Sequence, residues 1–160
     1  MATIEAVRLF LAYATQKNFK VYHMDVKSAF LNGELEEEVY IKQPEGCPLI
    51  DDKDIVCRLK KAMYGLKQAP RTWYARLDKH LTKLGYRKGM ADNNLYWKEI
   101  DDVLMILVIF VDDIIFGGND DESDKFAEEM KKEFEMSMIG EMKYFLGLQI
   151  VQDKEGIFIY

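Results

Sequence analysis

Three aspartates in this sequence stand where apolar segments end, and carboxylates in such places can bind cations. Asp112 and Asp113 lie side by side between the apolar runs 104–111 and 114–116, and two glycines follow. The first run is too short for a membrane-spanning helix and is rich in β-branched residues. We therefore predict a buried strand, a tight turn holding both acids, and a second strand. Carboxylates beside an apolar core are costly unless they are paired or bind a cation. Asp is also frequent in turns for local reasons, so a metal site and ordinary turn chemistry are both open.

Asp25 is near the end of another predicted strand, residues 19–26. The two-residue period of a strand places His23 and Asp25 on the same face. If this strand lies beside the predicted hairpin, the three carboxylates meet at one edge of a sheet. Hard oxygen ligands suit Mg²⁺, and two metal ions can stabilise the attacking and leaving oxygens of a phosphoryl transfer. The alternative is that the acids are unrelated. We interpret His23 as a packed or hydrogen-bonded side chain rather than a ligand.

The elements that must position these acids follow from periodicity and from turn and capping residues. Thr3 can cap a first helix, and Pro70 suits the first turn of another. We predict helices at 3–16, 70–84 and 120–136, a short helical turn at 27–33, and strands at 19–26, 39–42, 55–59, 94–99, 103–110, 144–151 and 157–160. Strands far apart in the sequence would then pair antiparallel, with the helices on one face of the sheet. That pattern is an α+β fold.

The composition is typical of one globular domain with a sizeable core. Of 160 residues, 49% are hydrophobic and 31% are charged, which argues against disorder. The formal net charge of -6 argues against a generic basic nucleic-acid binder, although it is compatible with a local basic groove. The concentrated basic residues are Lys60, Lys61, Lys67 and Arg71. The N-terminus lacks the pattern of a signal peptide, and we interpret Cys47 and Cys57 as reduced intracellular thiols.

Four segments resemble the motifs of copia-type retrotransposon reverse transcriptases, and they follow that family's order over nearly the whole chain. They are HMDVKSAFLNG at 23–33, MYGLKQAPRTWY at 63–74, FVDD at 110–113 and YFLG at 144–147. The first three are similar to the family's palm motifs, and the last is similar to its primer-grip motif. One residue departs from the pattern. Phe110 stands where the family usually has Tyr, which removes a hydroxyl expected near the primer terminus.

The resemblance implies an RNA-directed DNA polymerase with a palm-like antiparallel sheet. In that reaction the primer 3′-hydroxyl attacks the α-phosphate of a dNTP on an RNA or DNA template, and pyrophosphate leaves. Asp25 and Asp112 would be the principal ligands of two Mg²⁺ ions, with Mn²⁺ as a substitute, and Asp113 would assist. The backbone carbonyl of Val26 would complete one metal site.

The resemblance also implies a nucleotide site. Phe30 would be the aromatic gate that rejects a ribose 2′-hydroxyl, although a core aromatic is the alternative for this residue. Gly65, Gln68 and Pro70 would shape the nucleotide and template pocket.

Other residues would contact nucleic acid. Lys67 and Arg71 would touch phosphates, or they are simply exposed basic side chains. The residues implied near the primer end are Val111, Phe145, Leu146 and Gly147. For the last three, a plain packed strand is the alternative.

The family's architecture implies that 1–160 is a single palm domain with partial fingers and no thumb. The fingers would begin upstream of Met1, and the thumb, RNase H and integrase would also lie outside this chain. We therefore expect a polyprotein fragment whose partners include the upstream and downstream segments, with no membrane partner and an open oligomeric state. The alternatives are a non-catalytic remnant and another two-metal palm nucleotidyl transferase. We also expect the isolated chain to fold but to polymerise poorly, because its net charge repels a template duplex.

Overall fold

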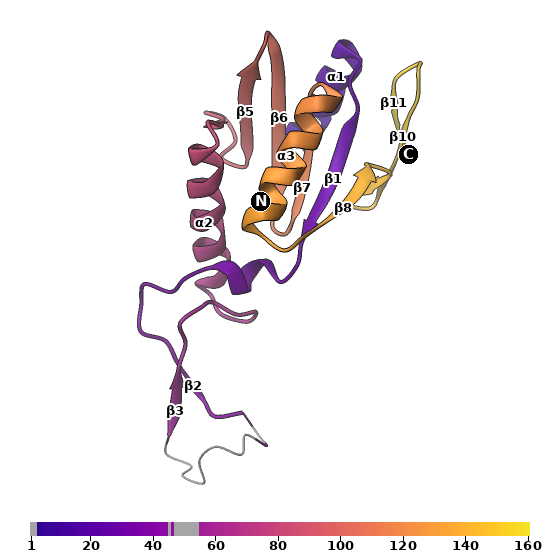
Figure 1. Cartoon of the computed structure of the whole chain (residues 1–160). Coiled ribbons are helices and arrows are strands. Elements are labelled where there is room, and N and C mark those ends of the chain that lie inside the picture. The colour runs from indigo at the N-terminus through magenta and orange to yellow at the C-terminus, as the bar shows by residue number, and fades with distance from the viewer. Residues whose placement is uncertain (1–2, 45, 47–54) are drawn as a thin grey trace. The chain divides into compact units, whose positions relative to one another are not determined.

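The computed structural model describes residues 3–44, 46 and 55–160, so Cys47 lies outside the described residues. The described chain is a mixed α/β structure whose sheets are antiparallel (Figure 1). It divides into two compact units, one of Met1–Lys27 with His80–Tyr160 and one of Ser28–Lys79. This division does not test whether residues 1–160 form a single domain, so the single domain stays a prediction. No helix among the described residues is long and apolar enough to cross a membrane.

Helix α1 (Ile4–Lys17) begins where the sequence predicts it. The Thr3 hydroxyl accepts a hydrogen bond from the Ala6 N–H at 3.3 Å, which satisfies one of the free N–H groups at the helix start. The helix ends at Asn18, whose φ of 55° is left-handed. Its apolar residues recur at helical spacing, and Val7 and Leu11 are buried.

The first unit is built on a six-stranded antiparallel sheet in the order β4-β5-β6-β7-β1-β8. Its strands are β1 (Val21–Val26), β4 (Arg87–Lys88), β5 (Leu95–Ile100), β6 (Val103–Phe110), β7 (Asp113–Gly117) and β8 (Met136–Glu141). Strands β6 and β7 form the predicted apolar hairpin, and β1 pairs with β7 so that Val21 is opposite Gly117. Glycine is required there, because a Cβ at Gly117 would lie 2.6 Å from the Lys20 carbonyl oxygen. The strand that carries Asp25 is therefore the neighbour of the hairpin.

Helices α1 and α3 (Asp120–Glu133) cover opposite faces of this sheet, so the prediction that all helices pack on one face is wrong. Ile115 belongs to a buried cluster that includes Phe10 of α1. Phe116, the next residue of β7, lies edge-on to Phe126 of α3 with ring centroids 4.9 Å apart. Consecutive strand residues point to opposite faces, which explains the two helix contacts. Figure 1 shows α3 in front of the sheet and α1 behind it.

Helix α3 is shorter than predicted, and a strand follows it. Its start is capped by Asn119, whose side chain accepts a hydrogen bond from the Glu122 N–H at 2.8 Å. The helix ends at Glu133, so the predicted end at Met136 is too late. Phe134 already has an extended backbone, and β8 then pairs with β1.

A three-stranded sheet of β9 (Tyr144–Phe145), β10 (Leu148–Gln152) and β11 (Ile157–Ile159) lies near the C-terminus. The prediction of one strand over 144–151 is wrong, because the chain reverses at Leu146 and Gly147. Their φ angles of 50° and 81° are left-handed, and β9 pairs antiparallel with β10. Ile150 joins the buried cluster beneath α1. The Gln152 side chain also hydrogen-bonds both backbone groups of Val21 at 2.8 Å, which ties β10 to β1.

The second unit contains the 3-10 helix η1 (Ala29–Asn32), strands β2 (Tyr40–Lys42) and β3 (Val56–Arg58), and the first part of α2 (Ala69–Lys83). The predicted strands at 39–42 and 55–59 correspond to β2 and β3, which pair antiparallel. Gly33, the last residue of the predicted helical turn, follows η1, and its φ of -75° is one that any residue can adopt. Space is the reason for glycine there, since a Cβ would lie 2.4 Å from the Thr72 hydroxyl oxygen.

Candidate functional site

The structure brings the three aspartates to the same end of the six-stranded sheet. Asp25 is directly opposite Asp113 across β1 and β7. Residues directly opposite each other in an antiparallel pair place their side chains on the same face. The Val26 N–H donates to the Asp112 carbonyl oxygen at 2.9 Å, which ties the end of β1 to the β6–β7 turn. The roles assigned to these residues stay predictions, while their arrangement at one sheet end is a feature of the fold.

Only Val111 and Asp112 form the β6–β7 turn, because Phe110 pairs directly with Asp113. The prediction that both acids lie in the turn is therefore wrong for Asp113, which begins β7. Val111 has a φ of 60°, and for a β-branched residue this left-handed conformation is a genuine outlier. Backbone strain of this kind costs on the order of 1–3 kcal/mol and is concentrated at functional sites.

Burial and neighbouring negative charges act together on Asp25. Burial raises the pKa of the Asp25 carboxyl above its ordinary value of 3.8, the negative charges of Asp113 and then Asp112 raise it further, and His23 opposes them. The ionised form of Asp25 is therefore disfavoured by its neighbours in the fold. A cation at this end of the sheet would relieve that repulsion.

His23 contacts one of the aspartates directly. Its Nε2 lies 2.6 Å from Oδ1 of Asp113, and its ring lies edge-on to the ring of Phe145. The interpretation of His23 as a packed and hydrogen-bonded residue is confirmed, although its contact with a site aspartate was not predicted. The signal that could have done so was the strand alternation, which puts His23 on the same face as Asp25.

The donor set suits Mg²⁺ in its chemistry, since it offers carboxylate oxygens. Within the described ranges, however, no group of three or more His, Cys, Asp or Glu side chains is gathered into a cluster that could hold a metal ion. One oxygen of Asp113 is already engaged by His23. Val26, the source of the predicted carbonyl ligand, is buried and pairs with Met136 of β8.

The residues of the predicted nucleotide site belong to the second unit. Phe30 is half-buried, and its ring lies 4.6 Å from the ring of Tyr64, so it is not a fully buried core aromatic. Gly65 is exposed with a φ of 92°, a conformation that favours glycine. The Gln68 side chain donates to Glu37 at 3.4 Å, and Pro70 is exposed in the first turn of α2.

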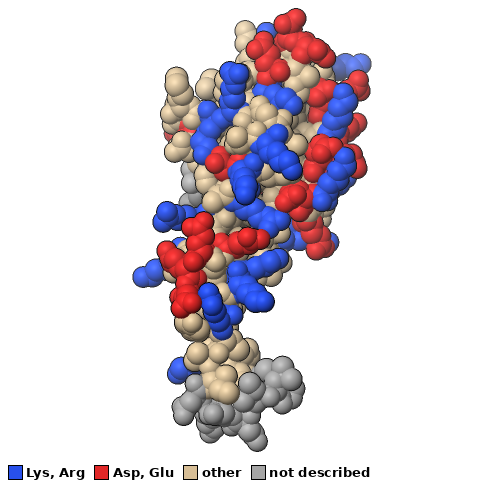
Figure 2. Space-filling view, turned by 60° about the vertical axis from the view of Figure 1, so that its left-hand side comes forward, with Lys and Arg blue, Asp and Glu red and all other residues tan. Residues whose placement is uncertain are grey.

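The basic residues of the second unit are exposed, and acidic residues accompany them. The exposed basic residues are Lys60, Lys61, Lys67 and Arg71. Lys61 forms a β-bridge with Glu34, and Glu38 forms an ion pair with Arg58 at 3.2 Å. Figure 2 shows basic and acidic side chains interleaved over the face that it presents. The surface around the concentrated basic residues is thus one of mixed charge.

The three residues of the predicted primer grip are placed differently from one another. Phe145 is buried, and its ring lies edge-on to Phe110 at 6.1 Å as well as to His23. Leu146 and Gly147 form the exposed turn between β9 and β10, so the plain packed strand is wrong as an alternative for these two. Phe145 is the member of this motif that contacts residues at the acid end.

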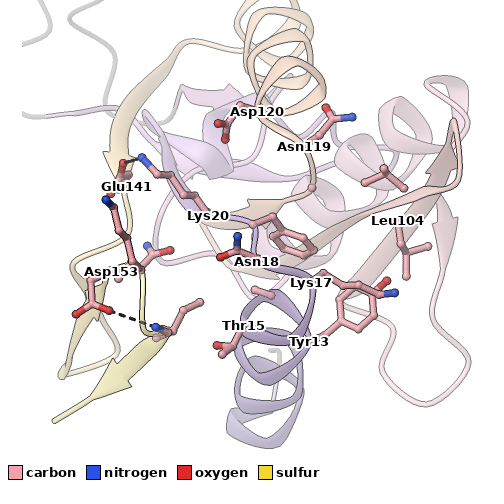
Figure 3. A pocket seen from close by; sticks show the side chains of 18 of the residues that line it. Tyr13, Thr15, Lys17, Asn18, Lys20, Leu104, Asn119, Asp120, Glu141 and Asp153 are labelled. Carbon is pink, nitrogen blue, oxygen red and sulfur yellow. Dashed lines mark hydrogen bonds and ion pairs between the residues drawn. The ribbon is translucent and has the colours of Figure 1, made fainter.

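A hollow of about 740 Å³ lies at the other end of the sheet (Figure 3). It is lined by Lys20, just before β1, and by Leu104, near the start of β6, whereas Asp25 is near the end of β1. Strand β1 has 6 residues and is about 20 Å long. Charges of both signs line the hollow, including the ion pair of Lys20 with Glu141. It is therefore separate from the acid end.

Comparison with known proteins gives a consistent result over the whole chain. Residues 1–160 match the family described as "Reverse transcriptase (RNA-dependent DNA polymerase)". The chain is 38% identical over 151 residues to the Retrovirus-related Pol polyprotein from transposon TNT 1-94 of Nicotiana tabacum, covering 93% of this chain and 11% of that protein. It is 35% identical over 153 residues to the polyprotein from transposon RE2 of Arabidopsis thaliana, covering 95% and 10%.

A more distant relative is the Transposon Ty1-MR1 Gag-Pol polyprotein of Saccharomyces cerevisiae, which is 29% identical over 153 residues, covering 91% of this chain and 8% of that protein. The chain spans about a tenth of the length of the plant polyproteins that it matches. No solved structure is significantly similar to it.

Proposed function

The chain belongs to the reverse transcriptase (RNA-dependent DNA polymerase) family, which confirms the resemblance predicted from its motifs, and from that premise we propose that it carries the catalytic acids of a copia-type retrotransposon polymerase. The reaction is template-directed transfer of a nucleotide from a dNTP to a primer 3′-hydroxyl, with release of pyrophosphate. The chain acts as a palm with partial fingers inside a longer Pol polyprotein.

Asp25 and Asp112 are the principal ligands for two Mg²⁺ ions in this proposal, with Asp113 and the carbonyl of Val26 assisting. When bound, the ions would neutralise charge on the attacking and leaving oxygens of the transfer. The protein's own part is to hold the carboxylates at one sheet end, where the β1–β7 register and the hydrogen bond from the Val26 N–H to the Asp112 carbonyl fix their backbones.

Residues of the second unit take the substrate roles in this proposal. Phe30 rejects a ribose 2′-hydroxyl, and Gly65, Gln68 and Pro70 shape the nucleotide pocket. Lys67 and Arg71 are exposed, so their charged groups are accessible to the phosphates of a nucleic acid. Each exposed basic residue that contacts a phosphate strengthens binding most at low salt.

One observation carries the proposal: Asp25 lies opposite Asp113, and burial, together with the charges of Asp113 and Asp112, raises the pKa of Asp25. Like charges are held together here at a free-energy cost, and a stable fold tolerates such a cost where a bound cation removes it.

A non-catalytic remnant is the second candidate function. Two observations favour it: the described residues contain no cluster gathered for a metal ion, and the basic patch of the second unit is mixed with acids. Another two-metal palm nucleotidyl transferase is the third candidate, and it would use the same acids without a template.

Primer extension on poly(rA)–oligo(dT) at low salt, with Mg²⁺ and then with Mn²⁺, separates these candidates. We expect little extension by the 160-residue chain, whose net charge of -6 repels a duplex. A longer polypeptide with the flanking Pol sequence should extend the primer, and Asp112→Asn in it should remove extension. Asp124→Asn, an exposed acid on α3, is the control and should leave extension unchanged. A longer polypeptide that is inactive with both metals would favour the remnant.

A further inference from the structure

We propose that His23 is a positioning residue for Asp113, and that Phe145 of β9 holds the His23 ring in the orientation that this requires. The inference rests on the proposed function for its purpose, but the contact itself can be tested without metal or substrate. His23 would fix one of the three acids in place before any ligand binds.

The pairing register of β1 with β7 explains how the His23 side chain reaches Asp113, which is not the residue directly opposite it. Asp25 is directly opposite Asp113, and His23 is directly opposite Ile115. His23 and Asp113 are therefore diagonal neighbours on one face, a separation of about 7–8 Å that a long side chain can bridge. The 2.6 Å separation of Nε2 from Oδ1 is that of a short hydrogen bond. A carboxylate oxygen accepts hydrogen bonds, so in this proposal the hydrogen lies on Nε2.

A second contact fixes the ring. The imidazole of His23 lies edge-on to Phe145, with ring centroids 5.9 Å apart and planes at 87°. Phe145 is itself held, because it is buried in the core cluster and lies edge-on to Phe110 at 6.1 Å. The His23 side chain is 11% exposed and the Asp113 side chain 31%, so the histidine is the more enclosed partner. The edge-on contact with buried Phe145 therefore limits the orientations open to the His23 ring.

This arrangement gives the three acids different freedom. Oδ1 of Asp113 is committed to His23, which leaves its other oxygen and remaining lone pair for a cation. Asp113 is thus a pre-oriented, partly used ligand, in keeping with an assisting role beside Asp25 and Asp112. Partners that orient a metal-binding group typically change affinity by about 10–100-fold when removed.

Long-range ¹H–¹⁵N spectra of the histidine rings in the metal-free chain, at one fixed neutral pH, test the contact. The chain has two histidines, so His80→Gln leaves the ring of His23 alone in the spectrum. We expect the hydrogen on Nε2, a shift of both ring nitrogens in Asp113→Asn, and a second ring orientation in Phe145→Leu. A bare Nε2, or a spectrum that Asp113→Asn leaves unchanged, would overturn the proposal.

Mn²⁺ binding, followed by the electron paramagnetic resonance signal of free Mn²⁺, tests the consequence. His23→Leu should weaken binding about tenfold or more, His23→Gln should recover part of the loss because it keeps an N–H donor, and His80→Gln should bind as wild type does. Equal affinity in the Leu variant and wild type would overturn the proposal, as would equal loss in the Leu and Gln variants. If wild type binds no Mn²⁺, the proposed metal site fails, and the ring spectra still decide whether His23 positions Asp113.

Discussion

Strand β6 has an Asp-Asp pair at each of its ends, and the two pairs are held differently. At its start, Asp101 and Asp102 form the whole turn from β5, since Ile100 pairs with Val103. Both aspartates are exposed and left-handed, with φ of 49° and 63°. Asp tolerates this conformation better than most residues do. Turn chemistry alone explains this pair.

At the other end of β6 the turn consists of Val111 and Asp112, so the Asp112–Asp113 pair lies one position later than Asp101–Asp102 does in its own turn. Val111 takes the left-handed position, Asp112 completes the turn, and Asp113 begins β7 opposite Asp25. If local turn preference alone decided the sequence, Asp and not Val would be expected at the left-handed position. The same dipeptide is therefore a turn former at one end of β6, while contacts with β1 set its place at the other end.

The largest difference between the pairs is expected in metal binding. Mg²⁺ or Mn²⁺ should raise the melting temperature of wild type, because a ligand that binds only the folded state stabilises it by about 2.7 kcal/mol at one hundred times its Kd. Asp112→Asn should lose most of that shift, and Asp102→Asn should keep it. Thermal melts with and without metal measure both. A shift of the same size in the two variants would mean that the pairs are equivalent.

A smaller difference is expected in the pH dependence of stability, measured in metal-free buffer. The folded-state pKa of Asp25 is raised above 3.8, so the folded chain binds this proton more tightly than the unfolded chain does. Stability is therefore lost as pH rises from 3.8 through the raised pKa, and stays lower above it. Asp25→Asn should melt higher than wild type at pH 7, and the difference should vanish below pH 3.8.

The matched control for this pH dependence is Asp101→Asn, in the exposed turn at the other end of β6. Asn tolerates the left-handed conformation as Asp does, so the turn is preserved. Its melting temperature should follow that of wild type across the pH range. An Asp25→Asn variant that is less stable than wild type at pH 7 would contradict the repulsion at this end of the sheet.

Much of this arrangement could be predicted from local pattern. The alternation in β1 placed His23 and Asp25 on one face, and capping residues marked the start of α1. The apolar run of β6 could not say which helix covers which face, because Met105 through Ile109 are all buried and both faces look alike. That ambiguity is why the helices were predicted on one face.

The other errors have local causes as well. Helix periodicity through Phe126, Met130 and Phe134 continues past the true helix end, so it concealed strand β8. The turn between β9 and β10 has glycine at its second position, Gly147, but Leu146 stands where Asn, Asp or Gly usually marks a hairpin. The segment was therefore predicted as one strand. The contact of His23 with Asp113 depends on the register between two strands, which the composition of either strand leaves open.

The smallest expected effect concerns the turn residues themselves. A left-handed conformation costs a residue with a Cβ about 1–2 kcal/mol, and glycine avoids it at an entropic cost of about 0.5–1 kcal/mol. Val111→Gly should therefore raise the free energy of unfolding by up to about 1 kcal/mol in metal-free urea titrations, with an unchanged m-value. Asp102→Gly should change it by less than about 0.5 kcal/mol, since the aspartate is exposed and already tolerates its φ.

Strain at Val111 has a functional meaning only if relieving it has a cost elsewhere. Val111→Gly loosens the turn that carries Asp112, so the stabilised variant should bind Mn²⁺ more weakly than wild type, as expected where stability and activity oppose each other. Asp102→Gly should bind as wild type does. If Val111→Gly were both more stable and equally good at binding Mn²⁺, the strain would serve no purpose at the acid end. The two turns of β6 would then differ only in geometry.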